Sequence, residues 1–133
     1  VEQATDQVAG KLLARLDGIP DTEFFRTIEE VVADRAILAY SGAHGLAELT
    51  APGVTKAAAL ARWAANRGIS PAQVWAFGDM PNDVPMLAWA GRSFAVGNAH
   101  PLALASASAV IGTNDEDGVA VQLEQLLAGS HTP

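Results

Sequence analysis

The first part of the chain combines a helical spacing of apolar residues with a short apolar run. Residues 5–16 are predicted to form a helix because their apolar side chains recur at three- and four-residue intervals, at Val8, Leu12, Leu13 and Leu16. Gly and Pro in residues 17–20 end that helix, and a second helix is predicted for residues 21–32. Residues 36–40 predict a short strand, and residues 44–49 are expected to pair back on it.

The pattern changes after the Ala51-Pro52-Gly53 segment, which we take as a domain boundary because Pro and Gly punctuate the chain there. Helices and strands alternate beyond it. The expected elements are a helix capped by Thr55 and ending at Gly68, a strand at 74–77, a helix at 82–90, a strand at 93–96, a helix at 101–105, a strand at 109–111 and a helix at 118–127. This alternation predicts parallel βαβ units in an α/β fold. The strands are uninterrupted apolar runs, as expected when helices cover both faces of the sheet.

Composition narrows the functional classes. Half of the 133 residues are hydrophobic and 17% are charged, which fits a soluble globular protein. The net charge of −7 argues against nucleic acid as a partner, because binding to the phosphate backbone requires a basic face. No apolar run is long enough to span a bilayer, so a membrane partner is not expected. The lack of cysteine fits a cytoplasmic location, and a first residue of Val1 rather than Met predicts a piece of a longer protein.

A cluster of polar residues directly follows the strand predicted at 74–77. The segment Gly78-Asp79-Met80-Pro81-Asn82-Asp83 leads from this strand into the next helix. Ligands of open parallel sheets bind beyond the carboxyl ends of the strands, so Asp79 is placed to face a ligand. Asn82 and Asp83 lie at a helix start, where free N–H groups favour an anion or a capping side chain. Three such oxygen donors suit Mg²⁺. The alternative is an ordinary strand–turn–helix in which Asn82 caps the helix.

Lys56 is a second anomaly, because it falls in the first turn of its predicted helix. The helix dipole disfavours a cation there by ~0.3–1 kcal/mol. An anion at the same helix end, gripped by the ammonium and by the helix N–H groups, would explain the placement. The alternative is an exposed lysine at a frayed helix end.

Taken together, these two segments carry a family resemblance. Val54-Thr55-Lys56, followed by Phe77-Gly78-Asp79-x-x-Asn82-Asp83-x-x-Met86-Leu87, resembles motifs III and IV of the haloacid dehalogenase (HAD) superfamily. The segments 95–99 and 114–120 resemble its Cof-type subfamily, whose members mostly dephosphorylate small phosphorylated metabolites. The resemblance covers residues 46–127. It implies a Rossmann-like three-layer parallel sheet, with residues 51–133 as the C-terminal half of the HAD-like core and residues 1–50 as a remnant of the α/β cap domain.

The resemblance also implies roles for particular residues. Lys56 would be the catalytic lysine that holds the phosphate, and Asp79 would be a ligand of the cofactor Mg²⁺. Asn82 would contact the phosphate. Asp83 would act in catalysis by supporting either the water shell of the metal or Lys56. The partner would be a small phosphorylated metabolite, hydrolysed through an aspartyl-phosphate intermediate.

The chain departs from the family in one respect. The family's motif I, an apolar strand leading into Asp-x-Asp-x-Thr, carries the nucleophile, and no such segment precedes the cap remnant. We therefore expect the nucleophile in a missing N-terminal segment of the same parent protein, and this chain alone to be inactive. Asp115 belongs to the only Asp-x-Asp, but Gly112-Thr113-Asn114 separate it from its strand, so we interpret it as a loop residue. The alternatives are a non-catalytic module and a phosphatase of the trehalose or mannosyl-phosphoglycerate type.

Overall fold

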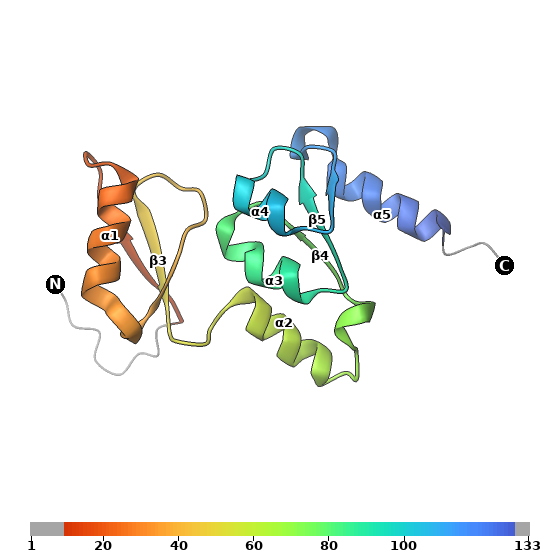
Figure 1. The fold of residues 1–133 in the computed structure, drawn as a ribbon, viewed down its shortest axis with the longest axis horizontal. Helices are drawn as coiled ribbons and strands as arrows, with labels where there is room; N and C mark the ends of the chain where they lie inside the picture. The colour runs from red at the N-terminus through yellow and green to blue at the C-terminus, as the bar shows by residue number, and fades with distance from the viewer. Residues whose placement is uncertain (1–9, 130–133) are drawn as a thin grey trace. The chain divides into compact units, whose positions relative to one another are not determined.

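The computed structural model describes residues 10–129, and the chain divides into two compact units, Val1–Val54 and Thr55–Pro133 (Figure 1). We refer to them as unit 1 and unit 2 and describe each by itself. None of the helices within residues 10–129 combines the length and the apolar composition that a membrane span requires.

Unit 1 is a small antiparallel sheet with one main helix. Its elements are β1 (Leu12–Arg15), α1 (Asp21–Val32), the 3₁₀ turn η1 (Ala33–Arg35), β2 (Ile37–Ala39) and β3 (Leu46–Thr50). The strand order is β1-β3-β2, with β3 antiparallel to both neighbours. The helix predicted at 21–32 and the pairing of residues 44–49 with the preceding strand are confirmed. Phe24 of α1 and Ala47 of β3 are the buried apolar residues of this unit among those described.

The helix predicted over residues 5–16 is wrong in its described part. Leu12–Arg15 form β1, which pairs with β3 from Leu12 opposite Leu49 to Arg15 opposite Leu46. A few leucines over one or two turns fit a helix or a strand equally well, and the long-range pairing with β3 decides between them. Residues 5–9 of the predicted helix lie outside the described part of the chain.

Unit 2 is an α/β layer structure around a parallel sheet (Figure 1). Its elements are α2 (Lys56–Ala65), η2 (Pro71–Gln73), β4 (Trp75–Gly78), η3 (Pro81–Asp83), α3 (Val84–Trp89), β5 (Arg92–Val96), α4 (Pro101–Ser106), β6 (Ala109–Ile111), η4 (Asn114–Glu116) and α5 (Gly118–Gly129). The strands are all parallel in the order β4-β5-β6. This arrangement confirms the predicted α/β class with a Rossmann-like parallel sheet.

Two predicted helices of unit 2 have different bounds in the structure. The helix predicted from Thr55 to Gly68 ends at Ala65, and the chain then turns through Gly68, whose φ of +67° is readily adopted only by glycine. The helix predicted at 82–90 is divided into the 3₁₀ turn η3 and the short helix α3. Pro81 and Pro85 each lie in the first turn of one of these pieces, where their missing N–H groups leave no helical bond unmade.

The core of unit 2 is built from small side chains around Leu87 of α3. Ala76 of β4, Ala95 of β5 and Ala103 of α4 are at most 4% exposed, and Leu87 is 1% exposed. The chain moves from β4 to β5 to β6 in one direction across the sheet, through α3 and then α4. Because such crossovers are right-handed, α3 and α4 lie on the same face of the sheet. Alanine on both sides of this interface lets the helices approach the sheet closely. The sheet edge that carries the polar cluster is thereby rigidly supported.

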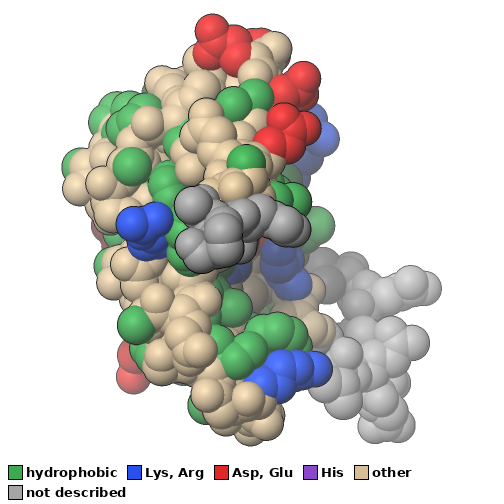
Figure 2. Space-filling view, turned by 90° about the vertical axis from the view of Figure 1, so that its right-hand side faces the viewer, with side chains coloured by type: hydrophobic (Ala, Val, Ile, Leu, Met, Phe, Trp, Pro, Cys, Tyr) green, Lys and Arg blue, Asp and Glu red, His purple; other side chains and the backbone are tan. Residues whose placement is uncertain are grey.

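Helix α5 keeps several apolar side chains at the surface. Val121, Leu123 and Leu127 are between 43% and 66% exposed. Figure 2 views the face from which α5 projects and shows hydrophobic side chains interspersed with polar ones, with acidic side chains gathered towards one end. Scattered exposed apolar residues of this kind are normal on protein surfaces.

Candidate active site

Asp79 lies directly beyond the carboxyl end of β4, as predicted. It follows Gly78, the last residue of the strand, and it is exposed. Within residues 10–129 its carboxylate has no hydrogen-bond or ion-pair partner, whereas its backbone is held on both sides. Its N–H donates to Asp83 Oδ2 at 3.1 Å, and its C=O accepts from the N–H of His100 at 2.8 Å. The structure therefore presents a carboxylate without a partner on a fixed backbone.

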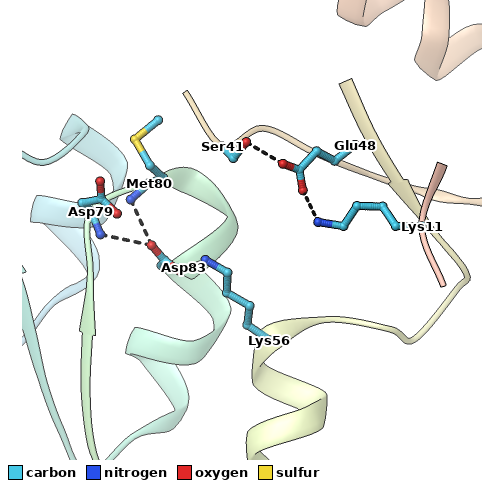
Figure 3. Close-up of polar contacts among 7 residues, drawn as sticks. All are labelled: Lys11, Ser41, Glu48, Lys56, Asp79, Met80 and Asp83. Carbon is cyan, nitrogen blue, oxygen red and sulfur yellow. Dashed lines mark hydrogen bonds and ion pairs between the residues drawn. The ribbon is translucent and has the colours of Figure 1, made fainter. Parts of the chain in front are cut away.

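Asp83 is the buried centre of this loop, with a side chain that is only 4% exposed. Its Oδ2 accepts the backbone N–H groups of Asp79 and Met80, each at 3.1 Å, and its Oδ1 accepts from Lys56 Nζ at 2.5 Å (Figure 3). Burial raises the pKa of the Asp83 carboxyl, but the bond from Lys56 and the two backbone bonds together outweigh it and hold the pKa below its usual value. Asp83 is thus a charged group with its hydrogen-bonding capacity largely satisfied.

Lys56 is the first residue of α2, so it lies at the helix end that disfavours a cation. Thr55 caps this helix by accepting the N–H of Ala58 at 3.1 Å on its Oγ1. The Lys56 side chain extends from the helix start to Asp83, and it remains 52% exposed (Figure 3). The anomaly noted in the sequence therefore has a partner in Asp83. Half of the side chain remains exposed, so a second anion can approach it.

Asn82 lies in η3 between the two aspartates, and it is partly buried. Its Oδ1 is fully buried and accepts no hydrogen bond from the described residues. The helix α3 has no side-chain cap bond at its start, so Asn82 does not act as an ordinary cap. A buried acceptor without a partner requires a physical reason, and a bound ligand or water is a common one.

The structure thus brings the predicted residues of unit 2 to one loop, with Lys56 joined to it through Asp83. No three His, Cys, Asp or Glu side chains converge into a metal-binding group within residues 10–129. Asp115 lies in η4, beyond the carboxyl end of β6, and is exposed. Nothing in the sequence indicates that His100 holds the backbone of Asp79, because that contact joins loops that follow two different strands.

Unit 1 contains a second polar cluster, centred on Glu48 of β3. Its side chain is 15% exposed, and it accepts from Lys11 Nζ at 2.5 Å and from Ser41 Oγ at 2.7 Å (Figure 3). Lys11 precedes β1 and Ser41 follows β2, so the carboxylate of the central strand is bonded to residues next to both edge strands. This cluster stabilises the small sheet, because the charged Glu48 on β3 is bonded to one residue beside β1 and to one residue beside β2.

Gly78 is required by the packing of the loop, and this gives a first testable prediction. A Cβ at Gly78 would lie 2.6 Å from Cβ and 2.9 Å from Cγ of Asp83. The position of this Cβ is fixed by the backbone, and Cγ can move only if the carboxylate gives up its hydrogen bonds. We expect Gly78→Ala to lower the free energy of unfolding by about 1–3 kcal/mol, the usual cost of forcing an extra methyl group into a packed site.

The measurement is urea unfolding of the 133-residue chain, with Gly129→Ala as the matched control. A Cβ at Gly129 would meet no atom within 4 Å, so this variant adds the same methyl group without a clash. Equal unfolding midpoints for the two variants would show that Asp83 does not pack against Gly78 as described.

Comparisons with known proteins identify relatives with the same organisation. The profile of the haloacid dehalogenase-like hydrolase family matches residues 2–123. The chain is 34% identical over 102 residues to the 5-amino-6-(5-phospho-D-ribitylamino)uracil phosphatase YbjI of Escherichia coli, covering 77% of this chain and 37% of that protein. It is 35% identical over 106 residues to the HMP-PP phosphatase of Yersinia enterocolitica, covering 78% of this chain and 38% of that protein. The chain thus spans little more than a third of the length of these curated relatives.

Solved structures agree with the sequence matches. A haloacid dehalogenase-like hydrolase from B. subtilis has a TM-score of 0.80 at 30% identity, over 93% of this chain and 44% of that chain. A protein from Plasmodium vivax described as a HAD/COF-like hydrolase has a TM-score of 0.82 at 28% identity, over 90% of this chain and 42% of that chain. The chain belongs to the haloacid dehalogenase-like hydrolases, of the Cof type.

Proposed function

We propose that this chain is part of a Mg²⁺-dependent phosphomonoester hydrolase that acts on small phosphorylated metabolites through an aspartyl-phosphate intermediate. The observation that carries the proposal is the assembly at the end of β4, where the buried Asp83 holds both Lys56 and the backbone of Asp79. It places two groups at one loop: the ammonium of Lys56, and the carboxylate of Asp79, which has no partner within residues 10–129. Phosphoryl transfer depends largely on such positioning and on neutralisation of charge.

The donor set at this loop fits one side of a magnesium site. Mg²⁺ in phosphate-handling enzymes is usually bound by one or two carboxylates, with waters and substrate phosphate completing its shell. Asp79 would supply one carboxylate, and the buried oxygen of Asn82 is an acceptor that awaits a donor such as a bound water. The ion would neutralise charge on the transferring phosphoryl group. The remaining protein ligand would come from the segment that carries the nucleophile.

The residues of this chain would have separate tasks. Lys56 would bind a phosphate oxygen through the exposed part of its ammonium group. Asp83 would act as a positioning residue, because its low pKa keeps it charged and its bond keeps Lys56 in place. The amide nitrogen of Asn82 would donate to the phosphate. The groups that would bind the phosphate are thus already held in place by this loop. Such preorganised groups do not have to rearrange during the reaction.

We further propose that residues 1–50 are the remnant of a cap domain and that residues 51–133 are the C-terminal half of the HAD-like core. The nucleophilic aspartate would lie on a segment outside these 133 residues. The support is the limited coverage of the relatives, since the chain spans only 37% of the YbjI phosphatase. We use "parent protein" for this chain together with that segment. Its partner would be a small phosphorylated metabolite, in line with the substrates named for the relatives.

Hydrolysis of p-nitrophenyl phosphate tests the proposal. We expect the parent protein to turn it over only when Mg²⁺ is present, and the 133-residue chain alone to show no activity above background. Absence of Mg²⁺-dependent hydrolysis by the parent protein, across a panel of phosphomonoesters, would contradict the proposed function. Turnover by the chain alone that Asp115→Asn abolishes would instead place the nucleophile at Asp115.

A further inference from the structure

Two asparagines join loops that follow neighbouring strands at the carboxyl edge of the sheet. Asn98 lies between β5 and α4, and Asn114 opens η4 after β6. The Nδ2–H of Asn98 donates to Oδ1 of Asn114, and the backbone N–H of Asn114 donates to Oδ1 of Asn98 at 3.3 Å. We call this reciprocal pair the amide clamp. Both residues are exposed, so apolar burial does not account for the contact.

The loop after β6 is itself held in place at the clamp. Glu116 Oε2 accepts both the backbone N–H and the hydroxyl of Thr113 at 2.9 Å, which fixes the start of η4. A Cβ at Gly97 would lie 3.2 Å from Cγ2 of Thr113, so the two loops approach each other closely beside the clamp. Asn114 therefore offers Asn98 a fixed partner.

The loop that contains Asn98 also reaches Asp79. Two residues beyond Asn98, the backbone N–H of His100 donates to the C=O of Asp79 at 2.8 Å. Nδ1 of the same histidine accepts the N–H of Leu102 at 3.2 Å and caps α4. The backbone of residues 98–100 thus connects the amide clamp to the bond from His100, so that the loop after β6 is linked through the loop after β5 to the residue that follows β4.

The geometry points to a positioning role for Asn98 and Asn114: we propose that the amide clamp holds the loop after β5 so that His100 can fix the backbone of Asp79. Loss of the clamp would let the exposed part of this loop, Gly97 and Asn98, move and would weaken the bond from His100. The orientation of the Asp79 carboxylate would then be less restricted. The clamp is inferred from the hydrogen bonds between Asn98 and Asn114. Its consequence for Mg²⁺ affinity rests on the proposed function of Asp79.

The expected loss of affinity follows from the fraction of competent conformers. A ligand that binds only one conformer has its apparent dissociation constant raised in inverse proportion to the population of that conformer. Hydrogen-bond partners that orient metal ligands typically contribute about 10–100-fold to metal affinity. We expect Asn114→Ala to raise the Mg²⁺ dissociation constant of the parent protein by about 10-fold, at the lower end of that range, because the clamp acts through the backbone.

A matched control lies at the opposite ends of the same two strands. Ser108 Oγ accepts the N–H of Ser93 at 2.8 Å and donates to the C=O of Ser93 at 2.7 Å, and Ser93 Oγ accepts the N–H of Ser108 at 3.0 Å. Ser93 is the second residue of β5, at the amino edge of the sheet, and it is buried. Ser108→Ala loosens the connection between β5 and β6 without touching the loops near Asp79. Asn114→Asp is the conservative variant, because its carboxylate can still accept from Asn98.

The experiment measures hydrogen exchange of the His100 amide by NMR in the parent protein, followed by a Mg²⁺ titration of the Asp79 signals. We expect Asn114→Ala to lower the protection of the His100 amide and to raise the Mg²⁺ dissociation constant. Asn114→Asp should restore the protection, and Ser108→Ala should lower overall stability but change neither readout. Unchanged protection in Asn114→Ala would overturn the clamp.

The titration separates failure of the clamp from failure of the proposed function. A drop in His100 protection with unchanged Mg²⁺ affinity in Asn114→Ala would overturn the positioning role. A wild-type parent protein whose Asp79 signals do not respond to Mg²⁺ would contradict the metal site of the proposed function. Hydrogen exchange of the His100 amide would still show in that case whether the clamp holds the loop, because that measurement requires no metal.

Discussion

Replacing Lys56 with alanine is expected to lower kcat/KM of the parent protein by about 100-fold or more, the usual effect of losing one preorganised electrostatic contact with a transition state. Lys56 lies at the unfavourable end of α2, and it is held there by Asp83 at 2.5 Å. Its removal takes away the ammonium that would neutralise the phosphoryl group. It also leaves the buried Asp83 with its two backbone donors alone.

Lys11→Ala is the matched control for this prediction. Lys11 makes an ion pair of the same length, 2.5 Å, with Glu48 of unit 1, and its side chain is exposed to a similar extent, 49% against 52% for Lys56. The two substitutions thus remove equivalent ion pairs. We expect kcat to fall only for Lys56→Ala, in steady-state kinetics at saturating Mg²⁺. Wild-type rates for Lys56→Ala would end the case for its catalytic role.

Replacing Asp79 with asparagine is expected to raise the Mg²⁺ concentration needed for half-maximal turnover by at least about 10-fold. Even the loss of a residue that only hydrogen-bonds to a metal ligand typically lowers metal affinity by that factor. Asn82 and Asp83 keep their positions in this variant, because the Asp79 carboxylate makes no hydrogen bond or ion pair within residues 10–129. The melting temperature should therefore change little. Activity measured across a Mg²⁺ titration gives the result directly.

Asp115→Asn is the control for this second substitution. Asp115 is another exposed carboxylate at the same edge of the sheet, in η4, and the same single charge is removed. We expect the Mg²⁺ dependence of this variant to equal that of the wild type. If the two variants shift the Mg²⁺ dependence equally, the effect comes from net charge near the sheet edge and not from a ligand at Asp79.

The sequence allowed most elements of unit 2 to be predicted because each is specified locally. Thr55 caps α2, glycines follow α2 and α3 within three residues, and short apolar runs form most of β4 and β5. The rule that ligands bind beyond the carboxyl ends of parallel strands was enough to single out Asp79. Lys56 was noticeable because it conflicts with the helix dipole, and the structure supplies the reason in Asp83.

Features that depend on long-range contacts could not be predicted. Leu12–Arg15 became a strand only through pairing with β3, more than thirty positions further along the chain. The division of the predicted helix at 82–90 follows from Asp83 turning back to the N–H groups of Asp79 and Met80. Asn98 and Asn114 belonged to segments that resembled the family, but only the folded sheet brings their side chains together.

Lys56 and Asp79 are proposed to serve the same phosphate, and a double-mutant cycle on kcat/KM of the parent protein shows whether they do. The cycle compares the wild type, Lys56→Ala, Asp79→Asn and the double variant at one Mg²⁺ concentration, that of half-maximal turnover by the wild type. Because groups that act as a unit are strongly non-additive, we expect the double variant to lose less than the product of the two single losses. Losses that multiply, or wild-type activity in either single variant, would contradict the account.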